Sequence, residues 1–569
     1  MARFAKHRLS ASLLAILLII IGLATAWNLE GFPARVDDDE GTYVAQAWAI
    51  IYQHTLTHYS YWYDHPPLGW IQIAAFAWVT DGFDRVADAV YVGREFMWCL
   101  TLVGCVLVYA LCRRLGLRQA TSAVAVLLFG LSPIGQYFHR MVSLDNIETI
   151  WVLAALVAAT SPKAGWGPAL RTGICTAFAM LSKETALIFL PVIVWVLWQH
   201  MVTPAEAATP GPGAAVVDAA EGGGAAAVVD PDAPVWMPDF AGQWQAWAAE
   251  RRARAARRAA GLARPQSGAK VWWESRASAS RAVRFRVFAI ALAAILLLYP
   301  LYALQRGQLS LLWSTLTWQF FDRPGSGSLL NSGSGTYSMV HSWVSTDPAL
   351  LIGGFVTALL TLLSRRLRPF GCTLLLQVVV LIHGGYLPYF YVTAVVPFAA
   401  VCIAGTADAL WAKADPPRFL RGAAARLGER AGRYMPYLGR AAVALAALTF
   451  AGYVLPQWVS YLNTNSRVHG NVPYLEAAAW AERNIPRGDV VVVDDYLWVD
   501  LKTHGLDPLW MWKIDAHTAP DWESIQYLLI QPQSPGTLAG MPTLRAAYAH
   551  SVLVKNFGGG LTVRRVIRG

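Results

Sequence analysis

The chain has 569 residues, of which 56% are hydrophobic and only 14% are charged. Soluble proteins carry about 25% charged residues, so this composition excludes an ordinary soluble protein and indicates a helical membrane protein with many spans. The formal net charge of +10 does not indicate nucleic-acid binding, because the basic residues lie mainly in short loops on one predicted side of the membrane.

The apolar segments predict a polytopic bundle. The first, 9–27, follows a basic N-terminus, and we expect an uncleaved helix whose N-terminus is cytoplasmic. The stretch 65–80 is short and broken by Pro66 and Pro67, so we expect a re-entrant or interfacial segment there. Further spans, which bring the total to about eleven, are expected at 94–113, 119–138, 144–160, 168–182, 184–200, 285–304, 348–364, 370–387, 389–411 and 441–459.

The charges of the loops support this topology. With the N-terminus inside, every predicted cytoplasmic loop is basic: 113–118, 163–171, 201–284, 365–368 and 413–440. The predicted outer loops hold an acidic cluster and few clustered Lys or Arg residues: 28–93, 139–143, 305–347 and the tail from 460. Counting 65–80 as a full span would invert the pattern.

This pattern divides the chain into four parts. Residues 1–200 form an N-terminal transmembrane module whose first outer loop is 28–93, and 285–459 form a second set of membrane helices with the outer loop 305–347. Between them, 201–284 begins as flexible low-complexity sequence and continues as a basic amphipathic helix expected on the cytoplasmic leaflet. Residues 460–569 predict a small extracytoplasmic α/β domain, with a helix over 473–484 and strands at 489–495 and 527–530.

An acidic run follows the first apolar segment. Asp37, Asp38, Asp39 and Glu40 are consecutive and stand near a predicted membrane boundary, where charge is costly and a function is favoured. The alternative is a solvated acidic loop that caps a short helix. Other charged residues recur at the outer ends of the predicted spans: Asp64, His65, Arg94, His139, Arg140, Asp145, Lys183 and Glu184.

This set of residue types suits sugar transfer. A carboxylate can accept the proton of an attacking hydroxyl, and Arg or Lys can hold a phosphate as it leaves. A lipid phosphate would explain a site at a membrane surface. The alternative for Arg94 with Glu95, and for Lys183 with Glu184, is an ion pair that fixes helix ends.

Several short motifs occur in a recognisable order: Asp39-Glu40-Gly41-Thr42-Tyr43, His65-Pro66-Pro67-Leu68, Arg94, Ser132-Pro133 with Arg140 and Asp145, and Leu181-Ser182-Lys183-Glu184. In these motifs the sequence resembles the membrane-embedded GT-C glycosyltransferases, in the branch of protein O-mannosyltransferases and lipid A aminoarabinose transferases. The resemblance covers about residues 1–200. It implies a mainly α GT-C fold and direct, inverting transfer of a hexose or pentose from a polyprenyl-phosphate sugar to a hydroxyl acceptor on the extracytoplasmic face.

The resemblance also implies roles for particular residues. It assigns catalysis to Asp39, Glu40 and Asp145. Asp39 is the base, or Asp38 if the alignment to the family motif shifts by one residue. It assigns binding of the donor phosphate to Arg94, Arg140 and Lys183. It assigns substrate binding to Asp38, Tyr43, Asp64, His65 and His341. No cofactor is required, although a divalent metal is considered at Asp64 and His65, with His341 as a third ligand.

Two other classes of function remain open at this point. A transporter or flippase of lipid-linked sugars would also place charges among broken helices. A membrane anchor or sensor with a ligand-binding outer domain would leave Arg94, Asp145 and Lys183 unexplained. The sugar and the acceptor, whether protein, lipid or glycan, are not indicated by the sequence.

Overall fold

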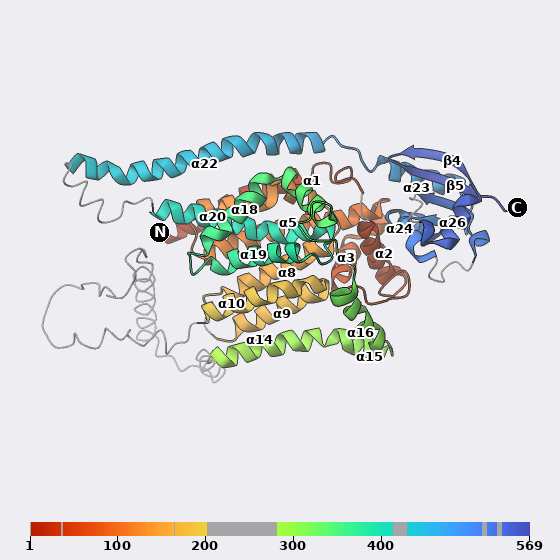
Figure 1. Cartoon of the computed structure of the whole chain (residues 1–569), viewed down its shortest axis with the longest axis horizontal. Helices are drawn as coiled ribbons and strands as arrows, with labels where there is room; N and C mark the ends of the chain where they lie inside the picture. Colours follow the sequence, from red (N-terminus) through yellow and green to blue (C-terminus); the bar gives the residue numbers. More distant parts are fainter. Residues whose placement is uncertain are drawn as a thin grey trace.

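The computed structural model describes residues 2–35, 38–163, 165–201, 281–413, 429–514, 521–531 and 538–568. Most of the predicted 201–284 insertion, including its basic amphipathic helix, lies outside these residues. Figure 1 shows a helical bundle with a small domain of strands and helices at one end and the N-terminus at the other end.

The first part of the bundle consists of helices that follow the apolar segments. They are α1 (Ala2–Ala26), α2 (Asp39–Tyr52), α3 (Leu68–Thr80), α4 (Gly82–Arg85), α5 (Ala89–Arg114), α6 (Gln119–Leu131), α7 (Pro133–Phe138), α8 (Leu144–Ala159), α9 (Gly167–Ser182), the 3-10 helix η1 (Glu184–Phe189) and α10 (Leu190–His200). The predicted span 119–138 is two helices, because Ser132 caps α7 by accepting a hydrogen bond from the Gly135 N–H at 3.1 Å and Pro133 occupies its first turn.

The second part of the bundle lies beside the first. It comprises α14 (Arg281–Leu296), α15 (Leu298–Gln305), α16 (Leu309–Thr317), the π-helical turn η3 (Trp318–Asp322), α17 (Gly335–Thr346), α18 (Pro348–Thr361), α19 (Arg368–His383), η4 (Tyr389–Tyr391), α20 (Val392–Lys413) and α22 (Glu429–Asn465). All the predicted apolar segments are therefore helical over most of their length.

The predicted number of spans is not confirmed. Among the described residues, four helices are long and apolar enough to cross a membrane, and a fifth span arises if α17 and α18, bent by 105°, count as one. Several of the remaining apolar helices, such as α3, α6 and α19, are shorter. The surface nevertheless suits lipid: only 11% of the most apolar window of α22 is buried, and this helix runs along the outside of the bundle in Figure 1.

Two kinds of loop lie at opposite ends of the bundle. Helices α1 and α5 run antiparallel, since Ser10 bonds to Tyr109 and Trp98 bonds to the Gly22 carbonyl. The basic loop after α5 therefore lies at the end that holds the N-terminus. The acidic first outer loop lies at the other end, against the C-terminal domain, as Figure 1 shows for α2 and α24 (Trp498–Thr503).

The C-terminal domain is a five-stranded mixed sheet in the order β2-β1-β3-β5-β4. Its elements are α23 (Val472–Asn484), β1 (Val490–Val493), η5 (Asp495–Leu497), α24, β2 (Asp507–Trp510), η6 (Met511–Lys513), η8 (Trp522–Ser524), β3 (Tyr527–Ile530), α26 (Pro542–Ala549), β4 (Ser551–Gly558) and β5 (Leu561–Val566). Strand β1 is parallel to β2 and β3, and β5 is antiparallel to β3 and β4. The predicted helix and both predicted strands are confirmed.

The sheet of the C-terminal domain packs against the first outer loop. Val491 and Val493 of β1 point to one face and belong to a core that also contains Tyr43 and Trp48 of α2. Val492 points to the other face and packs with Leu544 of α26. Because both faces are covered, β1 is a continuous apolar run, and the loop that carries the acidic cluster shares a core with the C-terminal domain.

Candidate active site

The acidic run ends at the first turn of α2. Asp39 is the first residue of this helix, and Tyr43, one turn on, donates a hydrogen bond from Oη to Asp39 Oδ2 at 3.2 Å. Asp38 differs: burial raises its pKa well above the usual value, and Asp495 and Asp494 raise it further. Trp510 Nε1 donates to the Asp38 carboxyl. Asp38 therefore contacts the C-terminal domain, whereas Asp39 bonds to a residue of its own helix.

A buried ion pair lies between α8 and the end of α9. Lys183 Nζ donates to Asp145 Oδ2 at 2.6 Å, and their side chains are 4% and 5% exposed. Ser143 Oγ also donates to Asp145, at 3.0 Å. One turn further along α8, Glu148 accepts a hydrogen bond from Thr185 Oγ1 at 2.6 Å. Asp145 thus fixes the ammonium group of Lys183, which has further N–H groups for an anionic ligand.

His65 and Glu184 form a second pair beside the first. His65 Nδ1 lies 2.8 Å from Glu184 Oε2. Burial alone would lower the pKa of His65, but the charge and hydrogen bond of Glu184, together with Asp64, raise it above 6.5. The carboxylate of Glu184 therefore favours the charged form of His65. Its backbone carbonyl accepts a hydrogen bond from Tyr61 Oη, which also bonds to Tyr299 at 2.8 Å.

These groups form one electrostatic cluster. Asp64 interacts electrostatically with Asp39 and His65, and burial raises the pKa of Asp64 above its usual value. His65 in turn interacts with Lys183. A geometric link supports this grouping: Tyr43, which bonds to Asp39, has its ring 6.4 Å from the ring of His65.

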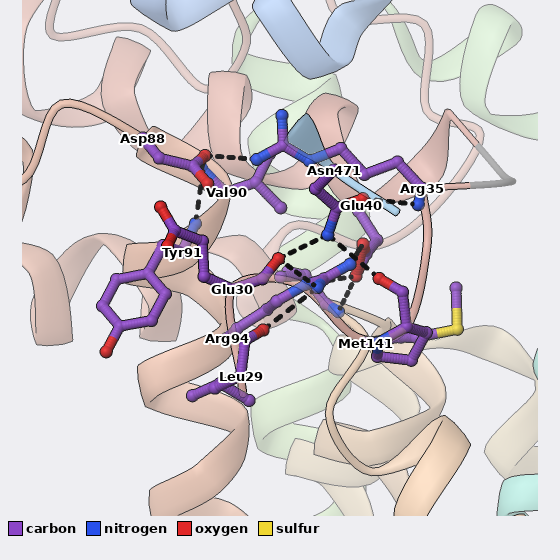
Figure 2. Close-up of polar contacts among 12 residues, drawn as sticks. Leu29, Glu30, Arg35, Glu40, Asp88, Val90, Tyr91, Arg94, Met141 and Asn471 are labelled. Carbon is purple, nitrogen blue, oxygen red and sulfur yellow. Dashed lines mark hydrogen bonds and ion pairs between the residues drawn. The ribbon is translucent and has the colours of Figure 1, made fainter. Parts of the chain in front are cut away.

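Glu40 and Arg94 bond to each other in the network that Figure 2 shows. Arg94 Nη2 donates to Glu40 Oε2 at 2.6 Å and Nε donates to Oε1 at 3.2 Å, with side chains 1% and 0% exposed. The third nitrogen, Nη1, donates to the carbonyls of Leu29 and Glu30, at 3.1 and 3.4 Å. Glu40 also accepts from the Val142 N–H at 3.0 Å. This geometry does not favour the predicted roles of Arg94 at the donor phosphate and of Glu40 in catalysis.

Arg140 also has partners inside the protein. Its Nη2 donates to the Ala24 carbonyl at 2.6 Å and to Gln136 at 2.9 Å, and the guanidinium lies over the ring of Phe32. These contacts connect the end of α1 to α7. The predicted donor role of Arg140 is likewise not favoured.

The predicted metal site does not fit the residues present. His341 is exposed on α17, where it stacks on Tyr337, while His65 is engaged by Glu184. Across the described ranges, no group of three or more His, Cys, Asp or Glu side chains could hold a metal ion.

Some residues of the site were missed by the sequence analysis. Glu148, Thr185 and Tyr299 extend the cluster, and Trp510 contacts the acidic run from the C-terminal domain. The position of Glu148, three residues after Asp145 on a helix, is the one local signal that could have found it, because such residues share a helix face.

Known proteins resemble this chain in part of its sequence and in its fold. The family model described as dolichyl-phosphate-mannose-protein mannosyltransferase matches residues 64–217. The crystal structure of ArnT from Cupriavidus metallidurans bound to undecaprenyl phosphate superposes with a TM-score of 0.56 at 14% identity, over 97% of each chain. The apo structure of that ArnT gives 0.53 at 13% identity, over 98% of each chain. No curated protein matches the sequence. The chain therefore shares the fold of ArnT, and residues 64–217 match the mannosyltransferase family model.

Proposed function

We propose that this protein is an inverting glycosyltransferase that moves a sugar from a polyprenyl-phosphate donor to a hydroxyl acceptor on the extracytoplasmic face. The observation that supports the proposal is the arrangement at one end of an apolar bundle: Asp39 is bonded to Tyr43, whose ring lies 6.4 Å from that of His65, and the His65–Glu184 and Lys183–Asp145 pairs are buried there. The fold of ArnT, solved with undecaprenyl phosphate, and the match to a dolichyl-phosphate-mannose family support it.

The reaction is a single displacement. The acceptor oxygen attacks the anomeric carbon of the sugar, and the bond between that carbon and the phosphate oxygen breaks. The acceptor proton passes to Asp39, which acts as general base. The lipid phosphate leaves with the bonding electrons, and the cationic groups of Lys183 and His65 stabilise its negative charge.

The remaining charged residues support these groups. Asp145 and Glu184 orient Lys183 and His65, from which they lie 2.6 and 2.8 Å away. The buried Glu40–Arg94 pair holds the start of α2 against α5. Arg140 holds the end of α1. We therefore assign Arg94, Arg140 and Glu40 to positioning, and the donor phosphate to Lys183 and His65.

The membrane placement follows the same proposal. The N-terminus and the basic loops face the cytoplasm, and the first outer loop and C-terminal domain face the other side. The N-terminus and the basic loop after α5 lie at one end of the bundle, and the first outer loop and the C-terminal domain lie at the other end, which supports this orientation.

Donor binding should weaken as the pH rises. The folded-state pKa of His65 is raised above 6.5, so its charge is present below that pKa and is lost as the pH rises through it. We expect the donor Kd to increase over this interval. In His65→Lys the charge persists to about pH 10, so the dependence should flatten between pH 6 and pH 9. An unchanged Kd of the unaltered protein across this range would contradict the role of His65.

Mass spectrometry of the lipid that co-purifies with the protein tests the donor class. We expect polyprenyl phosphate or its sugar ester in the unaltered protein and much less of either in Lys183→Met. Matched preparations in which neither lipid exceeds the level in an unrelated membrane protein would contradict the proposed donor.

A further inference from the structure

The C-terminal domain touches the catalytic helix at its first turn. Thr42 Oγ1 donates to Asp495 Oδ2 at 2.8 Å. Beside it, Gly41 lies so close to the domain that a Cβ there would be 2.3 Å from the Asp495 carbonyl carbon and from the Tyr496 nitrogen. Helix α2 and the backbone of η5 are therefore in direct contact, and a glycine permits the approach.

A second contact reaches the residue before Asp39. The Trp510 indole donates to the Asp38 carboxyl. Tyr59, from the same outer loop, accepts hydrogen bonds at Oη from the Trp510 N–H at 2.6 Å and from Trp498 Nε1 at 3.1 Å. The domain thus binds both α2 and the later part of the loop.

The loop is also tied to the C-terminal domain on either side of these contacts. Asn471 accepts a hydrogen bond from the Arg35 N–H at 2.9 Å and donates to the Pro33 carbonyl at 3.1 Å. Asp500 accepts from the Ala89 N–H at 3.0 Å. Figure 2 shows Asn471 beside the Glu40–Arg94 and Arg35–Asp88 pairs.

The start of α2 needs such external contacts. The first N–H groups of a helix lack partners within the helix, and a capping side chain usually satisfies one of them. Asp38 occupies the cap position of α2 but makes no side-chain capping bond. Its carboxyl is used by Trp510 instead. The turn that carries Asp39 is therefore held from outside the helix.

We propose that the C-terminal domain positions the general base: Asp495, through Thr42, and Trp510, through Asp38, hold the first turn of α2 so that Asp39 faces the cluster of His65 and Lys183. This inference rests on the proposed glycosyltransferase function. Asp495 and Trp510 are positioning residues, since their contacts are to the helix that carries the base. Misplacing a catalytic group by about 1 Å can cost about 100-fold in rate.

The test separates positioning from folding by comparing variants of the full-length protein in lipid nanodiscs. Thr42→Val removes the hydroxyl that bonds to Asp495, and Thr42→Ser retains it. Trp510→Phe removes the indole donor, and Trp512→Phe is its control, because Trp512 is 51% exposed in the same domain. For each variant, kcat and donor KM are measured with a polyprenyl-phosphate sugar, and kcat is divided by the number of donor-binding sites.

We expect kcat per site to fall about 10- to 100-fold in Thr42→Val and Trp510→Phe, with little change in donor KM, because the phosphate-binding groups lie on other elements. Thr42→Ser and Trp512→Phe should behave like the unaltered protein. An unchanged kcat per site in both test variants, even with a lower Tm, would overturn the inference and leave only a structural contact. If the unaltered protein binds donor but never transfers sugar, the proposed function itself fails, and this inference fails with it.

Discussion

Replacement of Asp39 by asparagine is expected to reduce sugar transfer by about 100- to 10,000-fold, because an amide cannot accept the acceptor proton. Donor binding should remain, since the proposed phosphate-binding groups are Lys183 and His65. The measurements are kcat with a polyprenyl-phosphate sugar and the donor Kd of the same preparation.

Asp84→Asn is the matched control for this prediction. Asp84 belongs to the same outer loop, but its carboxylate accepts a hydrogen bond from Tyr52 in an exposed position. It should transfer sugar at the normal rate. If Asp38→Asn abolishes transfer while Asp39→Asn retains it, the base has been assigned to the wrong carboxyl group.

Replacement of Lys183 by methionine is expected to lower the free energy of unfolding by about 3–5 kcal/mol, because it leaves the Asp145 carboxylate buried without its ion-pair partner. Both side chains are almost inaccessible, at 4% and 5% exposure, so solvent cannot replace the lost contact. The same variant should bind donor weakly. Thermal and denaturant unfolding, together with donor titration, measure the two effects.

The double variant Lys183→Met with Asp145→Asn separates stability from binding. It removes both charges, so most of the lost stability should return. Donor binding and transfer should not return, since the cation is still missing. Recovery of normal transfer in the double variant would show that Lys183 does not serve the donor, and a fully stable single variant would contradict the buried pair.

The helices were predictable because hydropathy marks them directly. The apolar segments and the strands around Val490–Val493 and Tyr527–Ile530 lie where the sequence places them. Hydropathy alone does not predict the number of membrane crossings, because a helix must also be long enough to cross. Helices α6, α8 and α9 are only 13 to 16 residues long. Ser132 and Pro133 also divide an apolar run that hydropathy treats as one span.

The partners of the charged residues could not be read from sequence neighbours. The sequence alternative paired Arg94 with Glu95, but consecutive helical residues point in different directions. Arg94 therefore pairs with Glu40, and Glu95 pairs with Arg85. Lys183 and Glu184 separate in the same way, toward Asp145 and His65.

The proposed role of the C-terminal domain could not be predicted from the sequence either. Asp495 and Thr42 are 453 residues apart, and no local pattern relates them. The sequence analysis expected the outer α/β domain but could not place it on the loop that carries the acidic run. That placement depends on the shared core of α2 and the sheet, which forms only in the folded chain.

The fate of the donor in nanodiscs tests the central claim most directly. A polyprenyl-phosphate sugar, labelled in the sugar, is incubated with the protein and a set of hydroxyl acceptors, and free lipid phosphate and labelled product are both quantified. We expect lipid phosphate and glycosylated acceptor to appear in equal amounts with the unaltered protein, and both to form about 100- to 10,000-fold more slowly with Asp39→Asn. Movement of the intact labelled lipid between leaflets of proteoliposomes, without release of lipid phosphate and at equal rates in both proteins, would contradict it.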